Sequence, residues 1–142
     1  MATEINRLVF KQSYGHYSQG MFIVLKEKRL PKEQEMINVG QALSEHLLTI
    51  PKAEHKDKLV SVLTSIIGNY KSISLTHLEI LFTPYLEVDP IGLLNSLCRN
   101  RKLCILWPGT IMNKKAFYAE PGEPEYYEKD LTFYQETYII TD

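Results

Sequence analysis

A short, uninterrupted apolar run near the N-terminus constrains the fold of this chain more than any other feature. Met21–Leu25 contains only apolar residues and has the length of a single strand. A strand with one solvated face alternates apolar and polar residues, whereas a continuous apolar run suits a strand buried on both faces of a parallel sheet. We therefore expect a mostly parallel sheet with flanking helices.

The remaining sequence alternates between helix-like and strand-like segments. In Asp57–Asn69, the apolar residues recur at the spacing of a core-facing helical stripe formed by Leu59, Val60, Leu63, Ile66 and Ile67. The predicted helices are Thr3–Lys11, Gln41–Ile50, Asp57–Asn69 and Pro90–Cys98, and the predicted strands are Met21–Leu25, Met36–Val39, Ser74–Phe82, Lys102–Trp107, Lys115–Ala119 and Leu131–Thr141. Such alternation predicts one α/β domain over residues 1–142, with the strand-rich tail adding an antiparallel edge.

Composition excludes several classes of protein. The 142 residues are 44% hydrophobic, as expected for one soluble domain, and the formal net charge of -1 argues against a broadly basic nucleic-acid binder. No apolar run approaches the length of a membrane span, and the first residues lack the pattern of a secretory signal. Cys98 and Cys104 are typical of reduced packing residues, so we expect a cytoplasmic protein.

A parallel α/β sheet prompts a search for a phosphate-binding loop after its first strand. Such a loop needs glycines, whose backbone N–H groups wrap the phosphate, and a Lys-Ser/Thr pair at a helix N-terminus. The segment Lys26–Glu35 contains neither, and it is too short for a loop, a helix and a return. We expect no nucleotide cradle and no cofactor. Lys28 and Arg29 are interpreted as parts of a solvated linker, with phosphate contact as the alternative.

Few residues point to catalysis or metal binding. The four histidines are scattered, and none has a partner at metal-ligand spacing, so no metal site is expected. His77 and Glu79 fall within the predicted strand Ser74–Phe82, where alternate residues share a face. They are either a general acid–base pair or, as we prefer, a polar pair at the rim of the sheet. Neither cysteine has a nearby histidine in the sequence that would favour a nucleophile.

The most basic segment is Arg99-Asn100-Arg101-Lys102, at the end of a predicted helix. Basic residues at this position complement the helix dipole. Arginine also makes bidentate contacts to acidic groups or to phosphate, so the segment is a candidate for binding a partner protein or a nucleic acid.

The segment Tyr118–Tyr127 combines two prolines, a glycine and three tyrosines. The prolines and the glycine predict a rigid turn, and tyrosine supplies stiff contact surface. The acidic residues from Tyr118 to Asp142 give this region a net charge of -6, against +5 for residues 1–117. The segment is either a protein-interaction loop or a lid packed on its own domain. The charge difference alone is also typical of a polar C-terminal segment folded over a slightly basic body.

An ordered series of short motifs resembles a known family. These motifs are Leu78-Glu79-Ile80-Leu81-Phe82, Asp89-Pro90, Leu93-Leu94, Arg99-Asn100-Arg101, Trp107-Pro108-Gly109 and Tyr118-Ala119-Glu120-Pro121-Gly122-Glu123-Pro124-Glu125-Tyr126. Together they resemble BrxF, the small P-loop protein of type 3 BREX phage-defence systems, over about residues 36–130. The resemblance implies a P-loop-NTPase-like fold.

The departures from the family pattern concern the catalytic machinery. The phosphate loop and its helix are missing after Leu25, and Thr76 stands where the family carries a metal-side aspartate. Glu79 is retained as the residual family-site position. Phosphoryl transfer depends on the missing parts. The resemblance therefore implies a degenerate relative that is not an enzyme.

We thus expect a non-catalytic interaction subunit of a BREX-like defence system that binds other defence proteins or itself. A nucleic-acid accessory that uses Arg99, Arg101 and Lys102 is one alternative, although it is not favoured. An enzyme with a site near His77 and Glu79 is another. The candidate interaction residues are Arg99, Asn100, Arg101, Tyr118, Glu120, Tyr126 and Tyr127.

Overall fold

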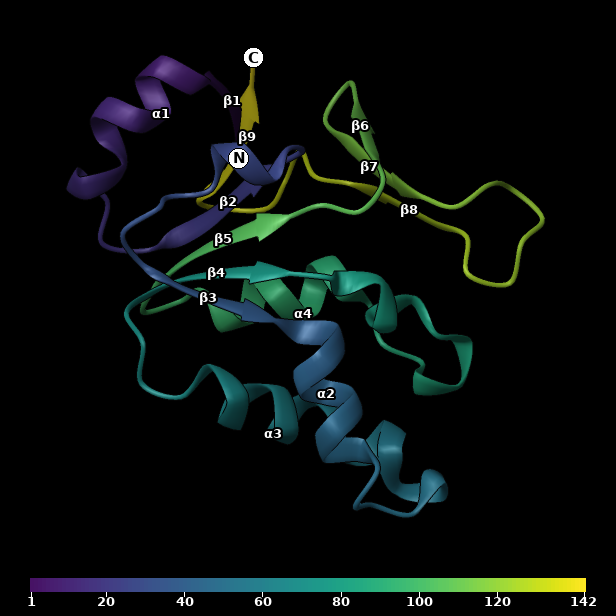
Figure 1. The fold of residues 1–142 in the computed structure, drawn as a ribbon. Coiled ribbons are helices and arrows are strands. Elements are labelled where there is room, and N and C mark those ends of the chain that lie inside the picture. The colour runs from purple at the N-terminus through teal and green to yellow at the C-terminus, as the bar shows by residue number, and fades with distance from the viewer.

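A six-stranded sheet, all of whose neighbouring strands run parallel, forms the centre of the molecule (Figure 1). The computed structural model describes residues 1–142. The strands lie in the order β1 (Ala2–Asn6), β9 (Thr137–Thr141), β2 (Gly20–Val24), β5 (Lys102–Leu106), β4 (Ser72–Thr76) and β3 (Glu35–Asn38). The helices are α1 (Arg7–Ser13), α2 (Val39–Leu47), α3 (His55–Ile67) and α4 (Pro90–Leu97). The predicted α/β class and the parallel sheet are confirmed.

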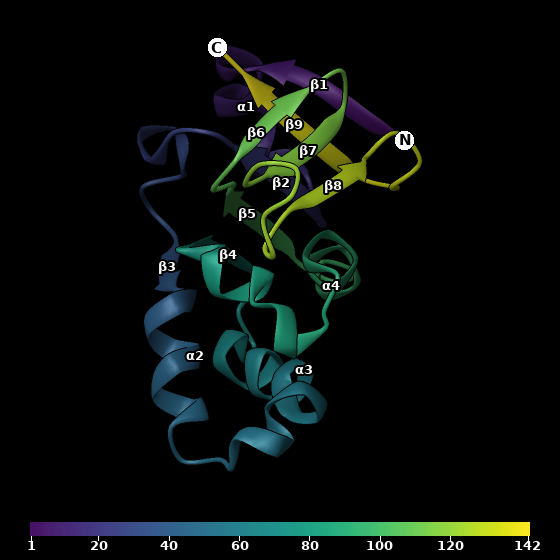
Figure 2. The same ribbon diagram turned by 90° about the vertical axis from the view of Figure 1, so that its right-hand side faces the viewer.

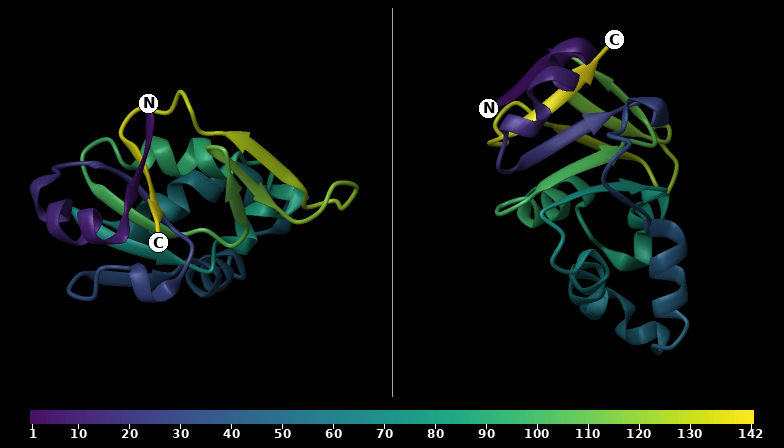
Figure 3. Two further views of the ribbon diagram at one scale, coloured as in Figure 1. Left: turned by 90° about the horizontal axis from the view of Figure 1, so that it is seen from above. Right: turned by 60° about the vertical axis from the view of Figure 1, so that its left-hand side comes forward.

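The N-terminus corrects the first predicted helix. Thr3 does not begin a helix but lies in strand β1, which pairs in parallel with β9 from the far end of the chain. Figure 3 shows these two terminal strands side by side. Helix α1 begins after Asn6, whose side-chain oxygen accepts a hydrogen bond from the backbone N–H of Val9 at 2.9 Å. A strand partner more than a hundred residues away overrides the local helical spacing.

One face of the sheet carries the main core. Helices α2, α3 and α4 pack their apolar residues against it, and Leu43, Leu63 and Leu94 are fully buried. Val60 was expected in the core stripe of α3 but is 49% exposed, because its position turns away from the sheet. Helix α3 ends at Gly68, whose φ of +60° is costly for other residues. No helix of the structure is both long and apolar enough to cross a membrane.

The other face has a smaller core and less helix. Helix α1 contributes Phe10, and the connection between β2 and β3 contributes Leu30, both packed near Phe22 of β2. That connection contains only one short 3-10 turn, Glu27–Arg29, and no α-helix. Figure 2 shows α1 at the opposite end of the molecule from α2 and α3.

The same connection also makes buried polar contacts. Gln34 donates a hydrogen bond to the hydroxyl of Ser74 at 2.9 Å and accepts one from the hydroxyl of Tyr14 at 2.7 Å. Ser74 is fully buried in β4. The interpretation of this segment as a solvated linker is therefore wrong for Leu30 and Gln34, although Lys28 is exposed.

Strand β4 is shorter than predicted. It ends at Thr76, because His77 adopts a left-handed conformation with φ +55° and turns the chain. The following Leu78–Phe82 forms a 3-10 turn, and a second such turn spans Pro84–Leu86. His77 and Glu79 therefore do not share a strand face, and the geometric basis of both alternatives, the preferred polar pair and the acid–base pair, is lost.

The tail forms a second, separate sheet instead of an antiparallel edge. This sheet is formed by β6 (Thr110–Met112), β7 (Lys115–Tyr118) and β8 (Tyr127–Asp130), which follow β5 and precede β9 along the chain. Its neighbouring strands pair in antiparallel fashion. The predicted strand Lys115–Ala119 matches β7, whereas only Thr137–Thr141 of the predicted strand Leu131–Thr141 is extended. Gly109 begins this region, and a Cβ atom there would lie 1.8 Å from the carbonyl oxygen of Phe117, so only glycine fits.

Candidate protein-interaction site

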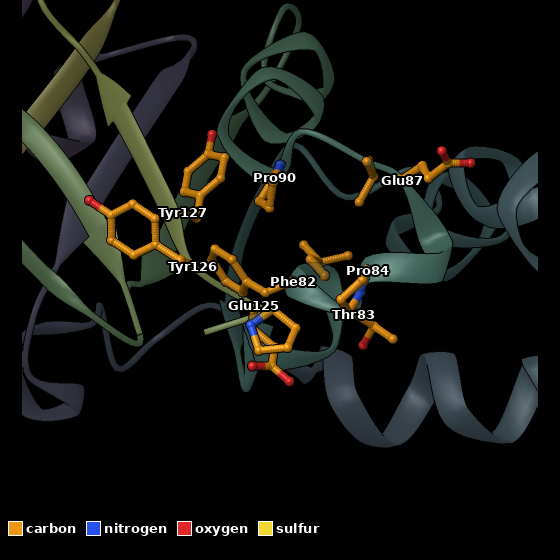
Figure 4. A pocket seen from close by; sticks show the side chains of 11 residues that line it. Phe82, Thr83, Pro84, Glu87, Pro90, Glu125, Tyr126 and Tyr127 are labelled. Carbon is orange, nitrogen blue, oxygen red and sulfur yellow. The ribbon is translucent and has the colours of Figure 1, made fainter. Parts of the chain in front are cut away.

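A small pocket lies between the segment that follows β4 and the loop that joins β7 to β8. Its volume is about 170 Å³. Figure 4 shows Tyr126 and Tyr127 on one side, with Pro84 and Glu87 on the other. The lining residues are Leu81, Phe82, Thr83, Pro84, Glu87, Val88, Pro90, Pro124, Glu125, Tyr126 and Tyr127. The pocket lies beyond the carboxyl end of β4, at the edge where parallel sheets usually bind their ligands.

An aromatic cluster supports one wall of this pocket. The ring of Phe82 stacks on that of Tyr118 with centroids 4.0 Å apart, and it meets the edges of Trp107 and Tyr127 at 5.5 and 5.4 Å. The indole N–H of Trp107 donates to the carbonyl of Phe117 at 3.0 Å. Aromatic pairs in such geometries add stability beyond the area they bury. The cluster therefore fixes the β7–β8 loop against the parallel sheet.

Tyr127 ties the loop to the start of α4. Its hydroxyl donates a hydrogen bond to the carboxylate of Asp89 and accepts one from the backbone N–H of Ile91 at 3.3 Å. Lys129 donates to the other oxygen of Asp89 at 2.7 Å. Burial raises the pKa of Asp89, but the hydrogen bonds from Lys129 and Tyr127 outweigh it and hold that pKa below its usual value. Tyr127 is thus an anchor of the loop.

The loop between β7 and β8 is shaped by its own turns. Ala119 and Gly122 both have positive φ, and a carboxylate oxygen of Glu123 accepts from the backbone N–H of Glu120 at 2.9 Å. The backbone N–H of Tyr126 donates to the carbonyl of Glu123 at 3.0 Å. These bonds, together with the two prolines, give the predicted rigid turn a structural basis.

The loop and its surroundings carry unpaired negative charge. Glu120, Glu123 and Glu125 are exposed and belong to no ion pair. Burial raises the pKa of Tyr118, and the negative charges of Glu79, Glu125 and Glu123 raise it further. Glu79 therefore lies near the loop and contributes to the same acidic surface. On the other rim, Glu87 is neutralised by Lys56, whose Nζ is 2.6 Å away.

The structure separates the two candidate interaction segments. Arg99, Asn100 and Arg101 follow the end of α4 at the amino edge of the sheet, where the carbonyl of Arg101 accepts from the backbone N–H of Gly20. The tyrosine-rich loop lies at the opposite, carboxyl edge (Figure 1). The two segments therefore do not form one surface.

Two of the three basic residues in the nucleic-acid alternative make contacts within the chain. The Arg101 guanidinium donates to the carbonyl of Gly68 at 3.1 Å, at the end of α3. The Nζ of Lys102 donates to the carbonyl of Tyr14 and lies 4.0 Å from the centroid of its ring. Arg99 is exposed. This pattern fits helix capping and packing better than a phosphate-binding surface.

The region around His77 shows no catalytic arrangement. The ring Nδ1 of His77 lies 2.9 Å from the hydroxyl of Thr76 and has no carboxylate partner. No group of three or more His, Cys, Asp or Glu residues is placed to hold a metal ion. Both cysteines are buried, and burial raises the pKa of the Cys98 thiol to about 11 and that of Cys104 to about 12. Both thiols are therefore poor nucleophiles at neutral pH.

Sequence reasoning identified Tyr118, Glu120, Tyr126 and Tyr127 but missed their supports across the pocket. The sequence predicts Phe82 in a strand and Trp107 at a strand end, while Asp89 is named only within the Asp89-Pro90 motif. The short spacing of Pro84, Pro90 and the acidic residues between them was a usable signal of an irregular surface segment. No protein-family model, curated protein or solved structure matches this chain.

Proposed function

We propose that this chain is a non-catalytic interaction subunit of a bacterial, BREX-like antiviral defence system, acting in the cytoplasm through protein–protein contacts. The ordered motifs that resemble BrxF support the defence role and the view of a degenerate P-loop domain. The glycine-free connection after β2, which contains no α-helix, supports a non-catalytic role. The function rests on one observation above all: the aromatic, proline-rich pocket bordered by the acidic β7–β8 loop.

The chemistry of this surface selects a basic partner. Tyrosine and phenylalanine side chains held by a rigid scaffold lose little conformational entropy on binding, and they anchor many interfaces. The unpaired carboxylates of Glu120, Glu123 and Glu125 complement lysine or arginine. An arginine that stacks on Tyr126 while pairing with Glu125 would use both features. The partner is therefore a defence-system protein, or a second copy, that presents a basic segment.

Charge reversal in the pocket tests this proposal. The products of the genes that flank this one are co-expressed with the tagged chain, and partner capture is measured by pull-down and sedimentation. Glu125→Lys and Tyr126→Ala should each weaken capture by more than about 1 kcal/mol, roughly a fivefold loss in affinity. Glu33→Lys changes an exposed, unpaired glutamate on another surface and serves as the matched control. Circular dichroism verifies that each variant is folded.

Capture that survives both pocket variants, or that the control removes equally, would place the working surface elsewhere. Loss only in Arg99→Ala would move it to the amino edge of the sheet. A steeply salt-dependent affinity for DNA, abolished by Arg99→Ala, would favour the nucleic-acid alternative.

Nucleotide binding gives a separate test of the degenerate site. Without a glycine-rich nest after β2, we expect millimolar Mg-ATP or Mg-GTP to leave the melting temperature unchanged. A ligand at a hundred times its dissociation constant would stabilise the fold by about 2.7 kcal/mol, which a thermal-shift assay detects easily. A saturable shift would contradict the proposed loss of the phosphate site.

A further inference from the structure

A second pocket lies at the carboxyl ends of β1, β9 and β2, apart from the tyrosine-rich loop. Its volume is about 220 Å³. Its lining residues are Glu4, Leu25, Lys26, Arg29, Ile111, Asn113, Ile139, Ile140, Thr141 and Asp142. Figure 3 shows the end of β9 beside β1 at this edge of the molecule. Most of the residues that line this pocket belong to strands or to the segments that directly follow strands.

Two cations in this pocket hold one carboxylate. The Nζ of Lys26 lies 2.6 Å from Oδ2 of Asp142, and the Nε of Arg29 lies 2.8 Å from Oδ1. Each carboxylate oxygen therefore has its own cationic donor. The side chain of Arg29 is only 19% exposed, whereas those of Lys26 and Asp142 are about half exposed. The two cations lower the pKa of Asp142 to about 2, so the carboxylate is charged at any physiological pH.

The cations retain binding capacity beyond this contact. Arg29 uses only its Nε toward Asp142, and its two terminal nitrogens make no hydrogen bond within the chain. Lys26 has three N–H donors and makes one ion pair. The other charge in the lining is the carboxylate of Glu4, which opposes a second anion. With Asp142 in place, the two positive and two negative charges of the lining balance, so an incoming anion gains most by taking the place of Asp142.

We propose that Lys26 and Arg29 form a binding site for a small dianion of the phosphate or dicarboxylate type, and that Asp142 occupies this site when the ligand is absent. A dianion interacts more strongly with two cations than one carboxylate does. The pocket is smaller than the 300 Å³ or so typical of sites for drug-sized ligands, which favours a small anion. Side chains rather than backbone N–H groups supply the donors, which distinguishes the site from a phosphate loop.

The test removes the internal competitor. Asp142→Asn keeps the shape of the side chain but not its charge, and inorganic phosphate and malonate are titrated separately at constant ionic strength. Binding is followed by the NMR shifts of the backbone amides from Leu25 to Arg29 and from Ile139 to Thr141. An intramolecular group competes at roughly millimolar effective concentration, so the affinity should rise at least about tenfold in Asp142→Asn. The two titrations show whether the site prefers phosphate or carboxylate.

Further variants test the role of the cations. In the Asp142→Asn background, Arg29→Gln and Lys26→Gln should each reduce the affinity about tenfold or more, because each removes one charge-assisted contact. Lys28→Ala serves as the matched control, because Lys28 is an exposed cation of the same turn with no ion pair. If Arg29→Gln fails to fold, the affinity of Lys26→Gln still tests the role of the cations. Equal affinity in the wild type and Asp142→Asn, or an equal loss in Lys28→Ala, would overturn the proposal and leave a purely structural ion pair.

Discussion

The two faces of the parallel sheet are covered in different ways. On one face, helices α2, α3 and α4, together with residues of the second sheet such as Ala116, cover a core of 24 buried residues. On the other face, a single short helix and the connection between β2 and β3 cover a core of six. The core of the first face consists of apolar side chains, whereas the cover of the second face also makes hydrogen bonds to the sheet.

This difference shows how a parallel sheet can lack one of its usual crossover helices. A parallel sheet normally buries both faces under helices, because its strands expose apolar side chains on both sides. Here β4 presents Ser74 and Thr76 to the thinly covered face and Ile73 and Leu75 to the helical face. Gln34 satisfies Ser74 from the connection. The polar side chains of β4 on this face need hydrogen-bond partners, which a segment such as this connection supplies and an apolar helix would not.

The helical face should be the more sensitive to the loss of a side chain. Leu63 is fully buried in α3, so Leu63→Ala should lower the free energy of unfolding by about 2–5 kcal/mol. Val60→Ala on the exposed side of the same helix is the control and should cost less than about 1 kcal/mol. Urea denaturation measures both. A small loss at Leu63 would show that the helical layer is not the main core.

The apolar part of the thin face should respond less strongly. Leu30 is 4% exposed but belongs to a connection that contains no α-helix, and such a segment can move inward to fill a cavity. We expect Leu30→Ala to cost about 2 kcal/mol, at the lower end of the range for buried leucines. The same urea measurement, with exposed Leu48→Ala as control, checks this value. A cost equal to that of Leu63→Ala would make the two faces equivalent.

On the polar part of the thinly covered face, the two hydrogen bonds of Gln34 should contribute to the stability of the fold. Gln34→Ala removes the partner of both Tyr14 and Ser74, and a buried polar group left without a partner costs about 1 kcal/mol or more. Gln41→Ala is the control, because Gln41 bonds only to the exposed Glu45 through its side chain. Thermal unfolding compares the two. An unchanged melting temperature in Gln34→Ala would mean that water replaces the amide without loss.

The smallest expected effect is the pH dependence of the ion pairs near the connection. Folding lowers the pKa of Asp142 from 3.8 to about 2, through its contacts with Lys26 and Arg29. A lowered pKa stabilises the folded state above the unfolded value, and this contribution disappears as the pH falls through the folded value. The stability difference between wild type and Asp142→Asn should therefore be constant near neutral pH and shrink below about pH 4. A difference that grows on acidification would contradict the assignment.

Much of the fold could be predicted from the sequence, because local patterns specify it. The continuous run at Met21–Leu25 predicts the parallel sheet, and the stripe through Leu59 and Leu63 predicts α3. The absence of glycine after β2 was visible without any structure. At the site, the prolines and tyrosines of the β7–β8 loop identified a rigid surface element, because these residue types restrict the backbone wherever they occur.

Tertiary structure decided the features that depend on distant partners. Ala2–Asn6 is a strand because β9 pairs with it, although its own spacing favours a helix. The left-handed turn at His77 ends β4 and brings the ring of Phe82 onto that of Tyr118. No local sequence pattern predicts this turn or this contact. The position of Arg101 and Tyr126 at opposite edges, and the contact of Asp142 with Lys26, likewise follow from the strand order. Chain segments that are far apart in the sequence meet only when the sheet forms. The periodicity and composition of the sequence therefore do not predict these contacts.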